Sequence, residues 1–175
     1  MGNPAGGALV RTSDRELTDY ERDILANVEE YGCHVTTVFD PDSDAPSFSY
    51  STGFSETLEQ GEVIVFGLSH NLMHQMVNVT MDLCREGLVL ADGERITGVL
   101  EGFDVVARQL PSAAIDREHF NSAMWFHRRR FGSELRTAFQ IVWPGAKQGL
   151  LPWDDGCDEY VIEMQPPLYE KGAVH

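Results

Sequence analysis

The chain of 175 residues contains few basic residues and no long apolar run. Thirteen lysines and arginines stand against 28 aspartates and glutamates, which gives a formal net charge of -15 at pH 7. This charge repels nucleic-acid phosphates and anionic lipid headgroups, so the sequence argues against nucleic-acid and membrane partners. The apolar runs are also far too short to span a bilayer. We therefore expect the protein to bind a small molecule or a basic protein partner.

Cysteine is scarce, and the usual catalytic motifs are missing. Cys33, Cys84 and Cys157 lie far apart in the sequence, without the close spacing of a zinc knuckle or a redox dithiol. We therefore expect free thiols and a cytoplasmic location, which the lack of a signal-peptide pattern also favours. Neither a Walker-type nor a dinucleotide glycine pattern occurs, and no Gly-x-Ser-x-Gly elbow supports a hydrolase.

The stretch from Ser47 to Gly67 carries the most informative pattern. Its first part alternates large apolar and small hydroxyl residues up to Gly53, which predicts a half-buried strand. Its last part is a short β-branched and aromatic run, typical of a fully buried strand. The hydroxyls and backbone N–H groups of Ser49–Gly53 suit phosphate or carboxylate oxygens. The same hydroxyls could instead face solvent or bond the adjacent loop.

Capping signals and hydrophobic periodicity predict the other elements. Capping boxes at Ser13 and at Thr18 predict a helix that begins near Asp14 or Asp19 and ends at Tyr31. We expect further helices over 70–86 and 116–131, a hairpin formed by 95–100 and 103–110, and strands over 33–40, 135–143 and 160–164. This order predicts an α+β domain with a mainly antiparallel sheet and flanking helices, either open or with a split-barrel-like curl. We expect a single domain over 13–165 between tails at 1–12 and 166–175.

Several short motifs resemble one bacterial family. They are Tyr-Gly-Cys-His-Val at 31–35, Phe-Ser-Tyr-Ser-Thr-Gly at 48–53, Glu-Val-Ile-Val-Phe-Gly-Leu at 62–68, Gln-Ile-Val-Trp-Pro at 140–144 and Pro-Trp at 152–153. From about Ile24 to Trp153 the chain resembles the family catalogued as domain of unknown function 4262 (DUF4262). The resemblance names no activity. It implies a shared surface or pocket marked by His34, Tyr50, Thr52, Gly53, Gln140, Trp143 and Trp153.

The order of the first strands also resembles the opening of flavin-binding split-barrel proteins. That likeness concerns architecture alone, because no flavin motif is present. It implies a flavin or another flat cofactor, usually held at a homodimer interface. An oxidoreductase is therefore one of the functions that the sequence leaves open.

The candidate ligand-binding residues follow from the motifs and from side-chain chemistry. Trp143 and Trp153 end a strand and a returning loop, where two indoles could stack a flat ligand or could instead cover the core. The predicted set is His34, Tyr50, Ser51, Thr52, Gly53, Gln140, Trp143 and Trp153. We expect them to surround a small ligand that is flat, aromatic or anionic.

Three other groups of side chains carry alternatives. His34 and Glu56 could form a general base with its orienting carboxylate, although a lone histidine on a strand is commonly structural. His70 and His74, with His34, have a spacing that can hold a metal, but no zinc-protease pattern follows and we expect no metal. Arg128–Arg130 can clamp a phosphate or complement a helix end. The main functional alternative to ligand binding is an acidic, partner-neutralising interaction domain, and whether the protein is an enzyme is left open.

Overall fold

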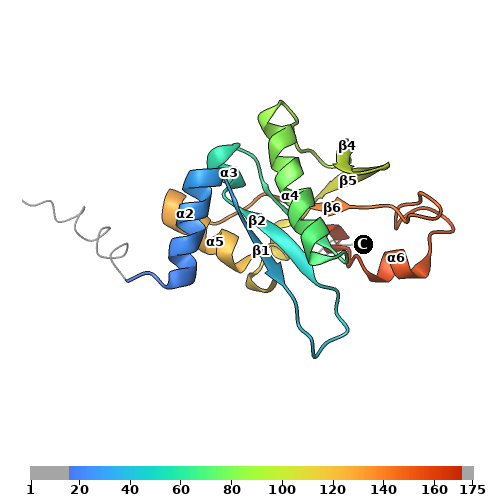
Figure 1. Ribbon diagram of the computed structural model, residues 1–175, viewed down its shortest axis with the longest axis horizontal. Coiled ribbons are helices and arrows are strands. Elements are labelled where there is room, and N and C mark those ends of the chain that lie inside the picture. The colour runs from blue at the N-terminus through green and yellow to red at the C-terminus, as the bar shows by residue number, and fades with distance from the viewer. Residues whose placement is uncertain (1–15, 171–175) are drawn as a thin grey trace, which may run out of the picture.

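The computed structural model describes residues 16–170, which form one six-stranded sheet with helices on both faces (Figure 1). The predicted tail at 1–12 and the capping box at Ser13 lie outside the described residues. The strands are β1 (His34–Val38), β2 (Phe48–Thr52), β3 (Glu62–Phe66), β4 (Arg95–Leu100), β5 (Phe103–Gln109) and β6 (Ala138–Val142). The helices are α2 (Asp19–Tyr31), α3 (Phe54–Thr57), α4 (His70–Arg85), α5 (Arg117–Phe131) and α6 (Glu159–Glu163).

The sheet is mainly antiparallel and open. Its strand order is β1-β2-β3-β6-β5-β4, and β3 and β6 are the one parallel pair of neighbours in it. The predicted α+β class is therefore confirmed. β1 and β4 are the two edges and do not pair with each other, so the sheet does not close into a barrel. The split-barrel-like curl is not formed.

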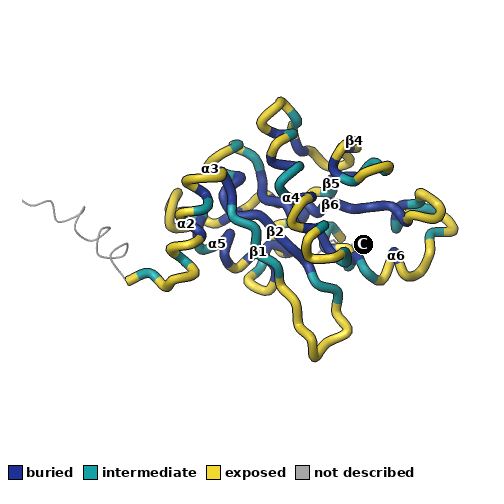
Figure 2. The backbone as a smooth tube through the Cα atoms, viewed as in Figure 1, coloured by how far each residue is buried: buried dark blue, intermediate teal, exposed yellow. Residues whose placement is uncertain are grey.

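The two faces of the sheet are covered by different helices. α4 packs on one face through Met73, Met76 and Val77, which join a core with Val63 and Val65 of β3. α5 covers the other face with Phe120 and Ala123. α2 lies beside α5, where Ile24 and Val28 contact Phe126. Coverage on both faces explains why the central strands are buried along their whole length (Figure 2).

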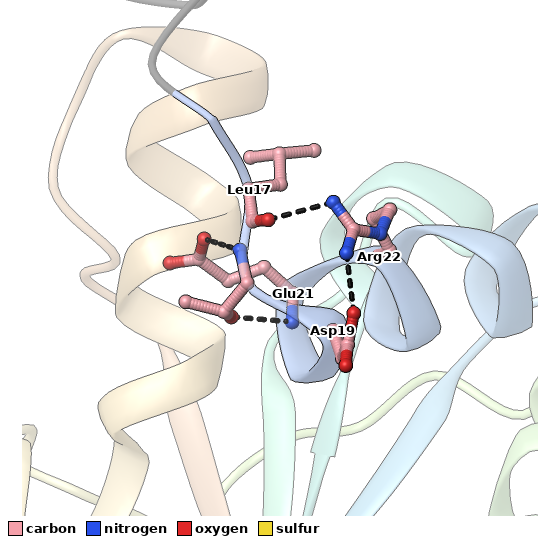
Figure 3. A network of polar contacts seen from close by, with 5 residues as sticks. Leu17, Asp19, Glu21 and Arg22 are labelled. Carbon is pink, nitrogen blue, oxygen red and sulfur yellow. Dashed lines mark hydrogen bonds and ion pairs between the residues drawn. The ribbon is translucent and has the colours of Figure 1, made fainter.

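The start of α2 shows how closely the local sequence specifies an element. Thr18 accepts a 3.0 Å hydrogen bond from the backbone N–H of Glu21, and the Glu21 carboxylate accepts one of 3.0 Å from the N–H of Thr18 (Figure 3). Arg22 pairs with Asp19 and donates to the carbonyl of Leu17 at 2.7 Å. The predicted capping box at Thr18 is confirmed, and the helix begins at Asp19.

β2 differs from its predicted half-buried form. All five of its residues are buried, including the small hydroxyl residues on alternate positions. Ser49 lies opposite Val65 in the sheet register, so it faces the core beneath α4, where it bonds the Thr37 hydroxyl at 2.7 Å. The two faces of β2 are therefore both buried but differ in chemistry, and the Ser49 and Ser51 hydroxyls on one face find hydrogen-bond partners inside the protein.

The C-terminal part also differs from expectation. Residues 159–163 form α6 rather than part of a strand over 160–164, because the Asp158 side chain accepts from the N–H of Tyr160 and caps a helical turn. A short apolar run cannot be told from a buried helical turn by periodicity alone. Residues 166–170, assigned above to the tail, pack on the sheet with Leu168 buried. Over residues 16–170, no helix has the length and apolar character needed to cross a membrane.

Candidate functional site

The hydroxyl-rich end of β2 surrounds a carboxylate of the chain itself. The Ser51 hydroxyl donates to Glu62 Oε1 at 2.6 Å, and the backbone N–H groups of Gly53 and Phe54 donate to its two oxygens at 3.0 and 3.1 Å. A fourth donor, the N–H of Ser55, lies 3.4 Å from Oε2. Glu62, Ser51 and Phe54 are all buried, whereas Ser55 lines a surface hollow.

In this arrangement the donors at the end of β2 bond a carboxyl group of the chain itself, Glu62. Gly53 has φ of 110°, a left-handed conformation that turns consecutive N–H groups toward one point. Burial raises the pKa of Glu62 to about 7, and its hydrogen bonds with Ser51, Phe54, Gly53 and Ser55 oppose that rise. The site joins β2, α3 and β3, and it acts as a structural clamp at this corner of the sheet.

Tyr50 and Gln140 are also buried and bonded within the fold. The Tyr50 hydroxyl accepts a 2.9 Å hydrogen bond from the N–H of Ser122 in α5. Burial raises the pKa of Tyr50 above its ordinary value. Gln140 donates to the carbonyl of Pro166 at 3.0 Å and accepts from the N–H of Leu168 at 3.0 Å. Both side chains hold other elements against the sheet rather than line an accessible pocket.

Trp143 and Trp153 lie at two separate hollows. Trp143 is buried, and its indole N–H donates to the carbonyl of Phe66 at 2.7 Å beside a hollow of about 440 Å³. Trp153 is 42% exposed and lines another hollow, of about 370 Å³, together with Arg108. The predicted stacking of both indoles over one cavity is therefore not seen in this arrangement.

A polar groove lies at the β1 edge of the sheet, between α2 and α4. It has a volume of about 660 Å³, and His34 is the member of the predicted ligand set that reaches it. α2 contributes Asn27 and Tyr31, and α4 contributes a row of polar side chains, His74, Asn78 and Asp82. We call this feature the α2–α4 groove.

His34 is fixed in the α2–α4 groove by neighbours on α2. Its Nδ1 lies 2.9 Å from the Asn27 side-chain nitrogen, and its ring packs edge-on against Tyr20 at 5.6 Å between centroids. Burial lowers the pKa of His34 below its ordinary value; Asp23 opposes this shift and His74 adds to it. With Asn27 as the donor, Nδ1 is the acceptor and the proton of the neutral ring lies on Nε2.

His34 and Glu56 do not form the predicted pair. The Glu56 carboxylate forms an ion pair with Arg130 at 2.7 Å, and Glu56 does not line the α2–α4 groove. The partner that orients His34 is an amide, Asn27, which cannot act as a carboxylate in a catalytic pair. The geometry thus supports His34 as a recognition group.

The three histidines considered for a metal are also arranged differently. His70 packs against the ring of Phe39 at 5.3 Å between centroids, whereas His34 and His74 both line the α2–α4 groove. Among residues 16–170, one group of side chains could together approach a metal ion, and it consists of Asp116, Glu118 and His119 at the start of α5. No histidine of the proposed metal set belongs to it.

The arginines at the end of α5 are exposed but contact other side chains of the chain. Arg128 pairs with Glu134, and Arg130 pairs with Glu56 while its guanidinium lies 5.1 Å from the ring of Phe126. Arg129 lies 5.9 Å from the ring of Trp125. These contacts favour the helix-end interpretation over a phosphate clamp.

Most of the α2–α4 groove is not predicted by the sequence motifs. Asn27, Asn78 and Asp82 were not singled out, and His74 was considered only for a metal. A usable signal was present, because His74, Asn78 and Asp82 follow each other at intervals of four residues and so share one face of α4. These three polar residues lie next to the buried, apolar face of α4, and they line the groove together with His34 of β1.

Comparison with known protein families finds a match to the family described as Domain of unknown function (DUF4262) over residues 27–158. The matched range contains the whole sheet and the α2–α4 groove. No curated protein and no solved structure matches the chain.

Proposed function

The chain belongs to the DUF4262 family, and we propose that this member binds a small, neutral or cationic polar molecule in the α2–α4 groove. The observation that carries the proposal is the partly buried imidazole of His34, held by Asn27 with its second nitrogen available for a ligand. A half-buried, oriented and neutral imidazole is a typical recognition group in a polar pocket.

The size and lining of the α2–α4 groove support this proposal. Its volume of about 660 Å³ lies within the range of small-molecule sites, about 300–1,000 Å³. Met81, Val35 and Tyr31 supply apolar and aromatic surface, while Asn78 and His74 supply hydrogen-bonding groups. A pocket with apolar surface and a few convergent polar groups is suited to a compact polar compound.

The charge around the α2–α4 groove favours a neutral or cationic ligand over an anionic one. Asp82 lines the groove, and the Asp23 carboxylate acts on His34 from α2. The lowered pKa of His34 leaves its imidazole neutral near pH 7, so it does not offset these carboxylates. Of the ligands expected from the sequence, a flat neutral compound therefore fits better than an anion. The flavin alternative loses its architectural basis because the sheet is open.

The test uses three probes of similar size and different charge. Nicotinamide, agmatine and benzoate are titrated into the 15N-labelled protein, and the signals of Asn27, His34 and Asn78 are followed by NMR. We expect nicotinamide or agmatine to shift these signals and benzoate to leave them in place. Asn78→Ala should weaken binding at least about fivefold, a change of roughly 1 kcal/mol. Glu29→Gln, on the exposed side of α2, serves as the control. Unchanged groove signals with both nicotinamide and agmatine would overturn the proposal.

Two finer expectations accompany this proposal. We propose a cytoplasmic location, since Cys33, Cys84 and Cys157 are all free thiols. We also propose that Cys33, although it lines the groove, is not a nucleophile, because burial raises its pKa to about 12. To decide whether the bound molecule is a substrate, it is incubated with the protein and analysed by mass spectrometry. A change in its mass identifies it as a substrate.

A second candidate function is supported by the loop between β1 and β2. Phe39 is 60% exposed and is followed by the exposed carboxylates Asp40, Asp42 and Asp44. An exposed aromatic anchor inside an acidic loop suits a basic protein partner. Under this proposal, Phe39→Ala abolishes capture of a basic partner and high salt weakens it. Retention of the same partner by Phe39→Ala would exclude this loop as the interface.

A further inference from the structure

A hollow at the β4 edge of the sheet carries two arginines beside an exposed tryptophan. It is lined by Arg95 of β4, Arg108 of β5 and Trp153, and its volume is about 370 Å³. Successive residues of a strand point to opposite faces of the sheet. Ala107 faces the core beneath α4, so its neighbour Arg108 lies on the other face. β4 and β1 are opposite edges of the sheet, so this hollow is distinct from the α2–α4 groove.

Arg108 is held in one orientation by three side chains. Its Nε donates to Asp92 Oδ1 at 3.0 Å. Its guanidinium carbon lies 5.0 Å from the ring centroid of Trp153 and 4.5 Å from that of Tyr169. The two rings meet edge-to-face at 88° with centroids 5.8 Å apart. A guanidinium within cation–π distance of two rings is pre-organised, and the bond to Asp92 uses Nε rather than the terminal nitrogens.

Arg95 brings a second positive charge to the same face. It lies directly opposite Val106 in the β4–β5 register, and Val106 and Arg108 are two residues apart on one strand. Arg95 and Arg108 are therefore diagonal neighbours on one face of the sheet. Arg95 is exposed, and within residues 16–170 its guanidinium forms no ion pair.

The charges in the hollow do not balance. Two guanidinium groups share it with one carboxylate, Asp92, in a chain whose formal net charge is -15. Burial alone would raise the pKa of Asp92, but the N–H of Gln109 and the Arg108 guanidinium outweigh it and hold that pKa below its ordinary value. Asp92 therefore stays ionised and compensates one arginine, which leaves an excess of one positive charge among the residues that line the hollow.

We propose that this hollow binds a small aromatic carboxylate. Its carboxylate is recognised by the guanidinium groups of Arg95 and Arg108, and its ring lies against the Trp153 indole. A monoanion matches the excess charge, and the planar guanidinium fork suits a carboxylate. The exposed indole supplies a flat apolar wall for a ring. The volume of about 370 Å³ suits a compound with a single ring.

The test uses 4-fluorobenzoate as the probe and 4-fluorobenzamide as its neutral analogue, both followed by 19F NMR with the full chain. We expect a dissociation constant for the benzoate in the millimolar range, since the overall charge of the protein opposes an anion. The amide should bind at least about tenfold more weakly, because it lacks the charge that the arginines recognise.

Two variants separate this site from general charge effects. Arg95→Gln removes one recognition group at an exposed position and should weaken benzoate binding at least about fivefold. Arg136→Gln removes an exposed arginine that lies outside the hollow and should leave binding unchanged. Equal binding of benzoate and benzamide, unchanged binding in Arg95→Gln, or the same loss in both variants would each overturn the proposal.

Discussion

The Ser51 hydroxyl donates a 2.6 Å hydrogen bond to Glu62 Oε1 across the β2–β3 pair, inside the protein. The same hydroxyl accepts a 2.9 Å hydrogen bond from the N–H of Val63. Ser51 thus joins two strands and a carboxylate through one oxygen. Since the N–H groups of Gly53 and Phe54 also point at Glu62, removing that carboxylate affects the backbone at the start of α3 as well as a side chain.

Replacing Glu62 should therefore destabilise the fold through its unsatisfied donors. We expect Glu62→Ala to lower the free energy of unfolding by about 4 kcal/mol, because it leaves buried N–H groups without an acceptor and creates a cavity. At pH 4.5, where the raised pKa keeps Glu62 protonated in the folded protein, Glu62→Gln should cost less, about 2 kcal/mol, because one oxygen remains to accept. Urea denaturation measures both values. Glu29→Gln, exposed on α2, should change the free energy by less than about 0.5 kcal/mol.

The pH dependence of stability should carry the signature of Glu62. Its pKa is raised from 4.5 to about 7 in the folded protein, so the native state binds a proton that the unfolded state has released. Between these values, stability contributed by this group decreases as the pH rises, in total by about 3 kcal/mol. We expect the difference between wild type and Glu62→Gln to change by this amount between pH 4.5 and 7. Parallel curves over that range would contradict the raised pKa.

Thr52 offers a test of an unpaired buried group. Among the described residues, its hydroxyl is the one buried side-chain polar atom without a hydrogen-bond partner. Thr52→Val keeps the shape and removes the hydroxyl, so we expect the free energy of unfolding to rise by about 1 kcal/mol. Thr52→Ser keeps the hydroxyl and loses a methyl group, and it should lower the free energy by about 1 kcal/mol. If Thr52→Val is instead clearly destabilising, the hydroxyl has a partner such as a buried water.

Much of the fold could be predicted from local sequence. The capping box at Thr18 and the hairpin turn between Leu100 and Phe103 depend on neighbouring residues, and both appear where expected. The role of Ser49–Gly53 could not be predicted in the same way. The Ser51 hydroxyl and the N–H of Gly53 do bind a carboxyl group, but it belongs to Glu62, which reaches them only after β2 and β3 pair. The sequence motif identified the hydrogen-bond donors of this segment but not Glu62, the residue that accepts from them.

The candidate site shows the same limit. His34 was singled out, but the α2–α4 groove exists because α2 and α4 pack on opposite faces and meet beyond the β1 edge. Trp143 and Trp153 are ten residues apart, yet the chain between them places one indole in the core and the other at the surface. The distance between two such residues in the fold depends on tertiary packing, which local sequence patterns do not predict.

Trp143 should contribute to stability through its indole nitrogen. Its N–H donates to the buried carbonyl of Phe66 at 2.7 Å, which fixes β6 to the end of β3. Trp143→Phe keeps an aromatic ring and leaves that carbonyl without this donor, so we expect a loss of about 2 kcal/mol in the free energy of unfolding. Trp153→Phe, at an exposed site, should cost about 1 kcal/mol or less. Equal losses in thermal or urea denaturation would contradict the structural role given to Trp143.

The titration of His34 should respond to each neighbour with a defined sign. Burial lowers its pKa, Asp23 opposes that shift and His74 adds to it, so the Cε1–H signal in NMR should titrate below the ordinary histidine range. Asp23→Asn removes a favourable negative charge, and we expect the pKa to fall further. His74→Gln removes a like charge, and we expect it to rise. Asn27→Ala removes a donor that stabilises the neutral ring through Nδ1, so this variant should also raise the pKa. A fall in the pKa with Asn27→Ala would show that the Asn27 amide oxygen, rather than its nitrogen, faces the ring, and it would place the ring proton on Nδ1.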